Sequence, residues 1–154
     1  MNSKKIKPQF IKKTNPRVGL IVLATDVMIE KDFLNVFSDI SADLFVNRIT
    51  NYNPVTADNL KKMTENITSV TKNILPGEKI DCVVYGCTSG TIVSGYDNIK
   101  KKINTAKPDA LVTAPSTAAI NALKRKNINK ISIVTPYIKT VSYTHLTLPT
   151  NREV

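Results

Sequence analysis

The chain has 154 residues, 42% of them hydrophobic and 22% charged, a composition typical of one globular domain with a real core. It carries 22 basic and 12 acidic residues, a formal net charge of +10. Most of the basic residues are lysines, without an arginine cluster or a ladder of aromatic residues, so the charge favours small anions over nucleic acid. No apolar run could cross a bilayer and no signal peptide is recognisable. We therefore expect a cytoplasmic protein without nucleic-acid or membrane partners.

The cysteine and histidine content argues against a disulfide framework and a metal site. Cys82 and Cys87 are the only cysteines, and at about 3.3 Å per residue of an extended strand they lie beyond bridging range. His145 is the only histidine, and no metal-ligand spacing is present.

From the N-terminus onward, strand-like and helix-like segments alternate. Residues 1–16 are rich in lysine, have no periodicity and are expected to form a flexible basic arm. The predicted strands are 17–24, 42–49, a run that begins at Ile80, 110–113 and 130–134. The predicted helices are 28–38, a long helix from Thr56 to Pro76, a polar helix from Thr91 to about Ile103 with a break at Gly95, and 115–126.

The long helix has the clearest periodicity. Its apolar residues recur every three or four positions and form one stripe that should face a sheet: Leu60, Met63, Ile67, Val70 and Ile74.

This alternation predicts an α/β fold, an open parallel sheet with helices on both faces. Ligands of such sheets bind beyond the carboxyl ends of the strands, near the switch in strand order. The residues there are Thr25 and Asp26, Arg48 and Asn51, Cys87–Gly90, Thr113–Thr117, and Thr135–Tyr137. They are rich in hydroxyls and suit a small carboxylate. They lack the glycine motifs of a dinucleotide or phosphate loop.

Cys87 is the candidate for chemistry. It follows Gly86 where a strand gives way to a helix, beside free backbone N–H groups that favour anions. We expect a lowered pKa and a nucleophilic or acid/base role for this thiol, with Thr88 and Ser89 holding a substrate carboxylate. The alternatives are that Cys87 is core filler and that Thr88 and Ser89 only cap the helix.

The other candidates also have structural alternatives. Asp26 is either a substrate contact or a cap of the first helix, and Ser116 and Thr117 are either ligand contacts or an N-cap. Tyr137 either offers a functional hydroxyl or packs against a neighbouring lobe. Cys82 lies within the strand and is expected to be a small buried hydrophobe.

The last residues break the pattern. Residues 142–154 (SYTHLTLPTNREV) have no helical stripe and resemble translated sequencing-adapter sequence. We interpret them as a non-native tail, give His145 no role, and expect residues 17–141 to be one lobe of a longer protein. A genuine irregular tail is the alternative.

The segments GLIVLATD, RITNYNPVT, YGCTSGT, APSTAAINALK and ISIVTPY, in this order, resemble the aspartate/glutamate racemase superfamily. Within it the sequence is most similar to the branch of maleate cis–trans isomerases, arylmalonate decarboxylases and ectoine-utilisation relatives. The resemblance implies two similar flavodoxin-like α/β lobes, with the active site between them and no metal or organic cofactor. The second lobe would be missing here.

The resemblance also implies roles for single residues. Cys87 matches the first of two cysteines, one in each lobe, Thr88 and Ser89 match carboxylate-binding groups, and Tyr137 matches a tyrosine that hydrogen-bonds the substrate. Asp26 stands where the isomerases have an asparagine. The decarboxylases have glycine at the first cysteine, so Cys87 favours an isomerase or racemase.

Three hypotheses follow from the sequence. The first is a cofactor-independent cysteine enzyme acting on a small carboxylate or dicarboxylate, isomerase-like, with racemase or decarboxylase activity as alternatives. The second is a ligand-binding lobe that is inactive by itself, and the third is a basic nucleic-acid or partner-binding domain. Association into homo-oligomers is compatible with each of them.

Overall fold

The computed structural model describes residues 15–132 and 134, which form one parallel sheet with six helices. The strands are β1 (Arg17–Leu23), β2 (Asp43–Ile49), β3 (Cys82–Tyr85) and β4 (Leu111–Thr113). The helices are α1 (Ile29–Phe37), α2 (Ala57–Glu65), α3 (Ile67–Lys72), α4 (Thr88–Ser94), α5 (Tyr96–Ala106) and α6 (Pro115–Arg125). The predicted α/β class and the parallel sheet are therefore confirmed.

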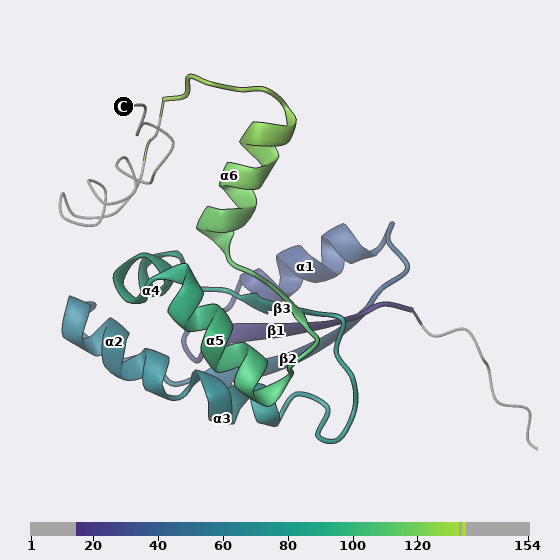
Figure 1. The fold of residues 1–154 in the computed structure, drawn as a ribbon, viewed down its shortest axis with the longest axis vertical. Helices are drawn as coiled ribbons and strands as arrows, with labels where there is room; N and C mark the ends of the chain where they lie inside the picture. Colours follow the sequence, from purple (N-terminus) through teal and green to yellow (C-terminus); the bar gives the residue numbers. More distant parts are fainter. Residues whose placement is uncertain (1–14, 133, 135–154) are drawn as a thin grey trace, which may run out of the picture.

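The strands lie in the order β2-β1-β3-β4, all parallel (Figure 1). The chain moves outward from β1 to β2, then returns to the other side of β1 for β3. The strand order thus reverses between β1 and β3, and loops at the carboxyl ends of these two strands border the place where α/β sheets bind ligands.

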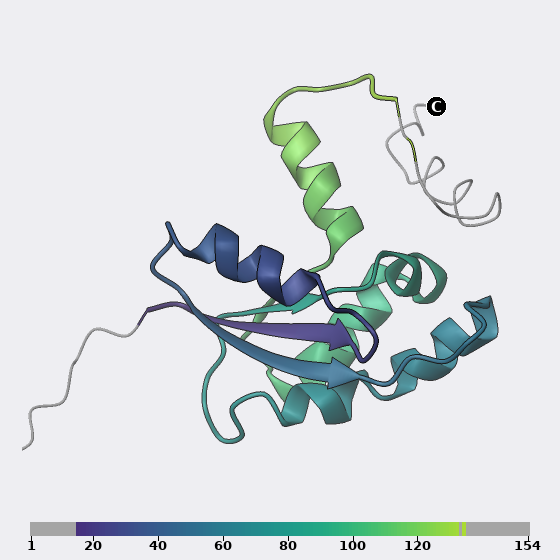
Figure 2. The same cartoon turned by 180° about the vertical axis from the view of Figure 1, so that it is seen from behind.

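Helices cover both faces of the sheet. α1 lies on one face, α2, α3 and α5 lie on the other, and α6 projects away from the sheet (Figures 1 and 2). The main core fills the space between the strands and the larger group of helices. Its fully buried side chains include Ile21, Val83, Tyr85, Met63, Ile67, Ile99 and Ile103. β1 is buried on both faces, as its continuous apolar run predicts.

The predicted long helix is two helices that meet at Asn66. The apolar stripe itself is confirmed, because Leu60, Met63, Ile67 and Ile74 are all buried. The Asn66 N–H bonds to the Met63 carbonyl three residues back, which tightens the turn. The Thr64 hydroxyl also donates to the Leu60 carbonyl, a contact that bends helices. The prediction of one continuous helix was wrong for this reason.

The predicted break at Gly95 is confirmed. Gly95 has a φ of +77° and separates α4 from α5, a backbone conformation that favours glycine. α4 begins at Thr88, three residues earlier than the sequence interpretation places this helix.

The predicted fifth strand was wrong. Residues 130–132 and 134 form no strand, and Val134 is 97% exposed. The Leu111 N–H faces β3, where it bonds to the Asp81 carbonyl, so the Ala110 and Val112 carbonyls face the open edge of β4.

Side chains of α5 occupy both of those edge carbonyls. The Asn104 amide donates to the Ala110 carbonyl at 2.9 Å, and the Tyr96 hydroxyl donates to the Val112 carbonyl at 2.6 Å. The edge therefore has its acceptors satisfied without another strand, and α6 leads the chain away from it.

Within the described residues, no helix combines the length and apolar composition needed to cross a membrane. The expected basic arm (apart from residues 15 and 16), the expected tail 142–154 and Tyr137 lie outside the described residues.

Candidate functional site

The turn from β3 to α4 places Cys87 beside the point where the strand order reverses. The Gly86 N–H donates to the Ile21 carbonyl of β1 at 2.8 Å, which continues the β1–β3 pairing into the turn. A Cβ on Gly86 would lie 2.8 Å from Ile29 Cδ1 and 3.0 Å from the Ile21 carbonyl oxygen. Glycine therefore lets the turn lie directly against β1 and the start of α1.

Cys87 is the N-cap residue of α4. Its extended backbone (φ −132°, ψ 107°) directs the side chain toward the first turn, where the Gly90 N–H donates to Sγ at 3.2 Å. The Ser89 hydroxyl lies 3.8 Å from the same sulfur. The predicted position of the thiol, beside backbone N–H groups at a strand-to-helix turn, is confirmed.

The expected lowering of the Cys87 pKa was wrong. The side chain is 4% exposed, and burial raises the pKa of the thiol above its ordinary value because a thiolate is poorly solvated there. The Gly90 N–H and the neighbouring hydroxyls of Ser89 and Tyr85 lower the pKa and oppose burial without overcoming it. In this chain, Cys87 is therefore mainly a protonated thiol at neutral pH.

Thr88 and Ser89 form the first turn of α4, and both side chains are half-buried. The two residues directly follow Cys87, and their predicted role in binding a carboxylate stays a prediction. Thr91, one turn further, donates its hydroxyl to the Cys87 carbonyl at 2.7 Å and fixes the backbone of the turn.

Asp26 has a helix-capping role in the structure. Its Oδ1 accepts hydrogen bonds from the backbone N–H groups of Met28 and Ile29, at 2.8 and 2.9 Å. Arg48 also stabilises this loop, because its guanidinium donates to the carbonyls of Leu23, Ala24 and Asp26 and pairs with Glu30. The capping alternative for Asp26 is thus the one that the geometry shows.

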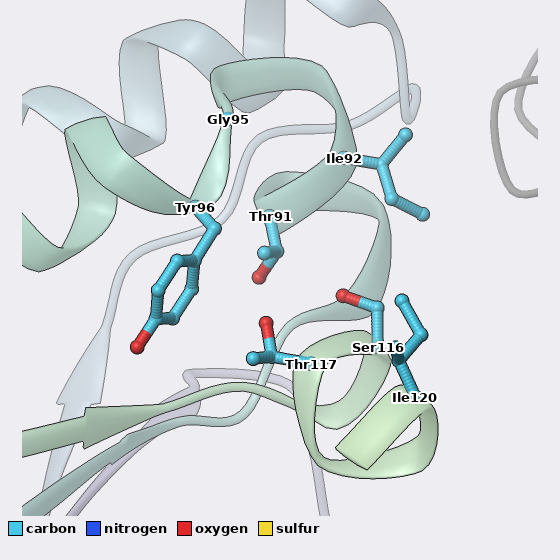
Figure 3. A pocket seen from close by; sticks show the side chains of 7 residues that line it. All are labelled: Thr91, Ile92, Gly95, Tyr96, Ser116, Thr117 and Ile120. Atoms are coloured by element: carbon cyan, nitrogen blue, oxygen red, sulfur yellow. The ribbon is translucent and has the colours of Figure 1, made fainter. Parts of the chain in front are cut away.

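Ser116 and Thr117 lie in the first turn of α6 and line a cavity of about 110 Å³ between α6 and the α4–α5 junction. Figure 3 shows their hydroxyls directed toward that of Thr91, with the Tyr96 ring at the border. The lining is Thr91, Ile92, Gly95, Tyr96, Ser116, Thr117 and Ile120. Cys87 is not part of it, so the structure does not bring these two hydroxyls and the thiol into one cavity.

Tyr85 is a residue of this region that the sequence interpretation missed. It is the last residue of β3, two residues before Cys87, and its side chain is completely buried. Its hydroxyl has no hydrogen-bond partner among the described residues. Its position at the end of an apolar strand, two residues before Cys87, could have indicated it.

Solved structures with a similar fold are maleate isomerases. A Nocardia farcinica maleate cis–trans isomerase, a cysteine-to-serine variant with a covalently bound succinylcysteine intermediate, aligns with a TM-score of 0.72 at 18% identity. The alignment covers 85% of this chain and 57% of the isomerase. The maleate isomerase Iso from Pseudomonas putida aligns with a TM-score of 0.67 at 17% identity, covering 85% of this chain and 57% of that one.

These likenesses confirm the fold that the sequence motifs predict, and the chain spans a little over half the length of the isomerases. No family model and no curated protein matches the chain.

Proposed function

We propose that the chain is one lobe of a cofactor-independent cysteine isomerase that converts a small cis-unsaturated dicarboxylate, such as maleate, to its trans isomer. The observation that carries this proposal is Cys87, on a maleate-isomerase fold, at the carboxyl end of β3 where the strand order reverses. The covalent succinylcysteine in the Nocardia farcinica protein supports a sulfur nucleophile for this chemistry.

The proposed reaction needs one nucleophile and donors for a carboxylate. The Cys87 thiolate attacks one alkene carbon, a carbon–sulfur bond forms, and the π-electron pair moves toward the carboxylate on the neighbouring carbon. The former double bond is now single and rotates. The electron pair then returns, re-forms the double bond in the trans geometry and expels the thiolate, with no net gain or loss of protons or electrons.

Thr88 and Ser89 are the proposed donors. Both residues are half-buried and the Ser89 hydroxyl lies 3.8 Å from the sulfur. Their hydroxyls would stabilise the charge that develops on the carboxylate. Ser116 and Thr117 extend the proposed carboxylate-binding surface, and Tyr137 is proposed to hydrogen-bond the substrate. Asp26 is proposed to act on the site through the loop that it caps.

The near-complete burial of Cys87 supports a role for a second lobe. The thiol is 4% exposed and its raised pKa keeps it protonated, so attack requires a change in its surroundings. We propose that a second lobe supplies the other wall of the site, and with it the second cysteine and the group that receives the thiol proton.

Turnover in the two-lobe protein tests this function. Conversion of maleate to fumarate, followed by NMR, should fall by about a thousandfold or more in Cys87→Ser, because the nucleophile is lost. Cys82→Ser is the matched control and should retain activity, since Cys82 lies within β3. Undiminished turnover in Cys87→Ser would refute the role of Cys87.

The burial of Cys87 also favours a second candidate function, binding of a small carboxylate without turnover. If the two-lobe protein binds maleate by calorimetry but NMR detects no fumarate, this alternative is the correct one.

A further inference from the structure

Tyr85 is a completely buried tyrosine whose hydroxyl has no hydrogen-bond partner among the described residues. Leaving a buried donor unpaired costs about 1–3 kcal/mol in general. Such a cost in an otherwise well-packed core calls for an explanation, and a catalytic role is one that buried unpaired groups have.

The Tyr85 hydroxyl and the Cys87 sulfur face the same small space above Gly90. A Cβ on Gly90 would lie 2.7 Å from the hydroxyl oxygen, 3.0 Å from Sγ and 3.1 Å from Met63 Cε. Glycine at this position therefore leaves room for the two polar atoms to approach each other.

The hydroxyl is also close to Thr64. Both Thr64 and Cys87 influence the pKa of Tyr85, yet neither meets the distance and alignment of a hydrogen bond to its hydroxyl. Thr64 already donates to the Leu60 carbonyl and is paired with the Ser94 hydroxyl at 2.7 Å. Cys87 becomes a stronger hydrogen-bond acceptor when it ionises, because a thiolate accepts hydrogen bonds more strongly than a thiol.

Burial raises the pKa of Tyr85 far above its ordinary value, so the phenol keeps its proton and can only donate to a neighbouring anion. Besides burial, the groups that set the Cys87 pKa are the Gly90 N–H, Ser89 and Tyr85. No charged side chain of the described residues is among them, so these three donors are what can stabilise a thiolate.

We propose that Tyr85 is a positioning residue for Cys87, whose hydroxyl turns to the sulfur and donates a hydrogen bond when the thiol ionises. In this chain the thiol proton leaves to solvent, and in the two-lobe protein it passes to the proposed acceptor of the second lobe. Tyr85 keeps its own proton, and a buried donor without a partner gains one. The inference deepens the proposed function, because a nucleophilic Cys87 needs this stabilisation.

The test is an NMR pH titration of the isotope-labelled Cβ of Cys87 in this chain. In Tyr85→Phe the Cys87 pKa should rise by about one unit, a roughly tenfold lower ratio of thiolate to thiol at a given pH. Tyr96→Phe, which removes a hydroxyl bonded to the Val112 carbonyl, is the matched control and should leave this pKa unchanged. The Cβ signal of Cys82, recorded in the same titration, serves as an internal reference for the Cys87 signal.

A folded Tyr85→Phe protein with an unchanged or lower Cys87 pKa would overturn the proposal. If circular dichroism shows that this variant does not fold, a ring-fluorinated tyrosine incorporated at position 85 provides the test instead. Its more acidic phenol is a stronger donor and should lower the Cys87 pKa, and no lowering would overturn the proposal. No substrate is involved, so the result is independent of whether the isomerase activity is found.

Discussion

At Cys87, burial and the neighbouring donor groups shift the pKa in opposite directions. Burial raises the pKa of the thiol, while the Gly90 N–H and the Ser89 and Tyr85 hydroxyls lower it. The position of the thiol at a helix N-terminus could be predicted from the glycine that follows an apolar run. Its burial could not, because the core cluster to which Cys87 belongs includes side chains from a helix distant in sequence, such as Met63.

The raised pKa makes stability depend on pH. As pH rises past the ordinary thiol pKa of about 8.5, the unfolded chain ionises at Cys87 while the folded chain does not. Below that pH the neutral buried thiol makes its whole contribution to the free energy of unfolding. This contribution is lost as the pH rises from the ordinary pKa to the raised pKa of the folded state.

We expect the free energy of unfolding of wild type to fall more steeply than that of Cys87→Ala as pH rises through this window. The difference amounts to about 1.4 kcal/mol for each unit of pKa shift. Urea unfolding followed by circular dichroism measures both slopes. Cys82 is present in both proteins, so parallel slopes would contradict the raised pKa of Cys87.

Among the elements, the boundaries of β1, α1 and α6 follow from local sequence, whereas the division of α2 from α3 does not. The stripe from Leu60 to Ile74 is compatible with one helix or two. The break depends on the tightened turn at Asn66 and the back-bonding hydroxyl of Thr64, which a hydrophobic period does not reveal. The open edge of β4 was equally hidden, because the side chains that satisfy it belong to α5.

The loop between β1 and α1 offers a test of the capping role of Asp26. Asp26→Ala removes the acceptor of the Met28 and Ile29 N–H groups and should lower the free energy of unfolding by about 1 kcal/mol. Asp26→Asn keeps a side-chain oxygen and should retain most of that stability. Chemical denaturation compares the three proteins, and an Ala variant as stable as wild type would show that the cap contributes nothing.

For the whole molecule, the alternation of strands and helices was sufficient to predict the parallel sheet, and the motif order was sufficient to predict the maleate-isomerase likeness. The assembly of the site was not predictable to the same extent. Ser116 and Thr117 line a cavity apart from Cys87, and Tyr137 lies outside the described residues. The proposed site takes walls from two lobes, and one lobe would then hold only part of its geometry.

The account depends on a bond between the sulfur of Cys87 and a substrate carbon. Peptide-resolved mass spectrometry of the two-lobe protein, quenched with acid during turnover of maleate, tests this bond directly. The account predicts the mass of one added dicarboxylate on the peptide that contains Cys87, and its absence in Cys87→Ser. Turnover with no adduct on Cys87, at a rate that Cys87→Ser retains, would contradict it.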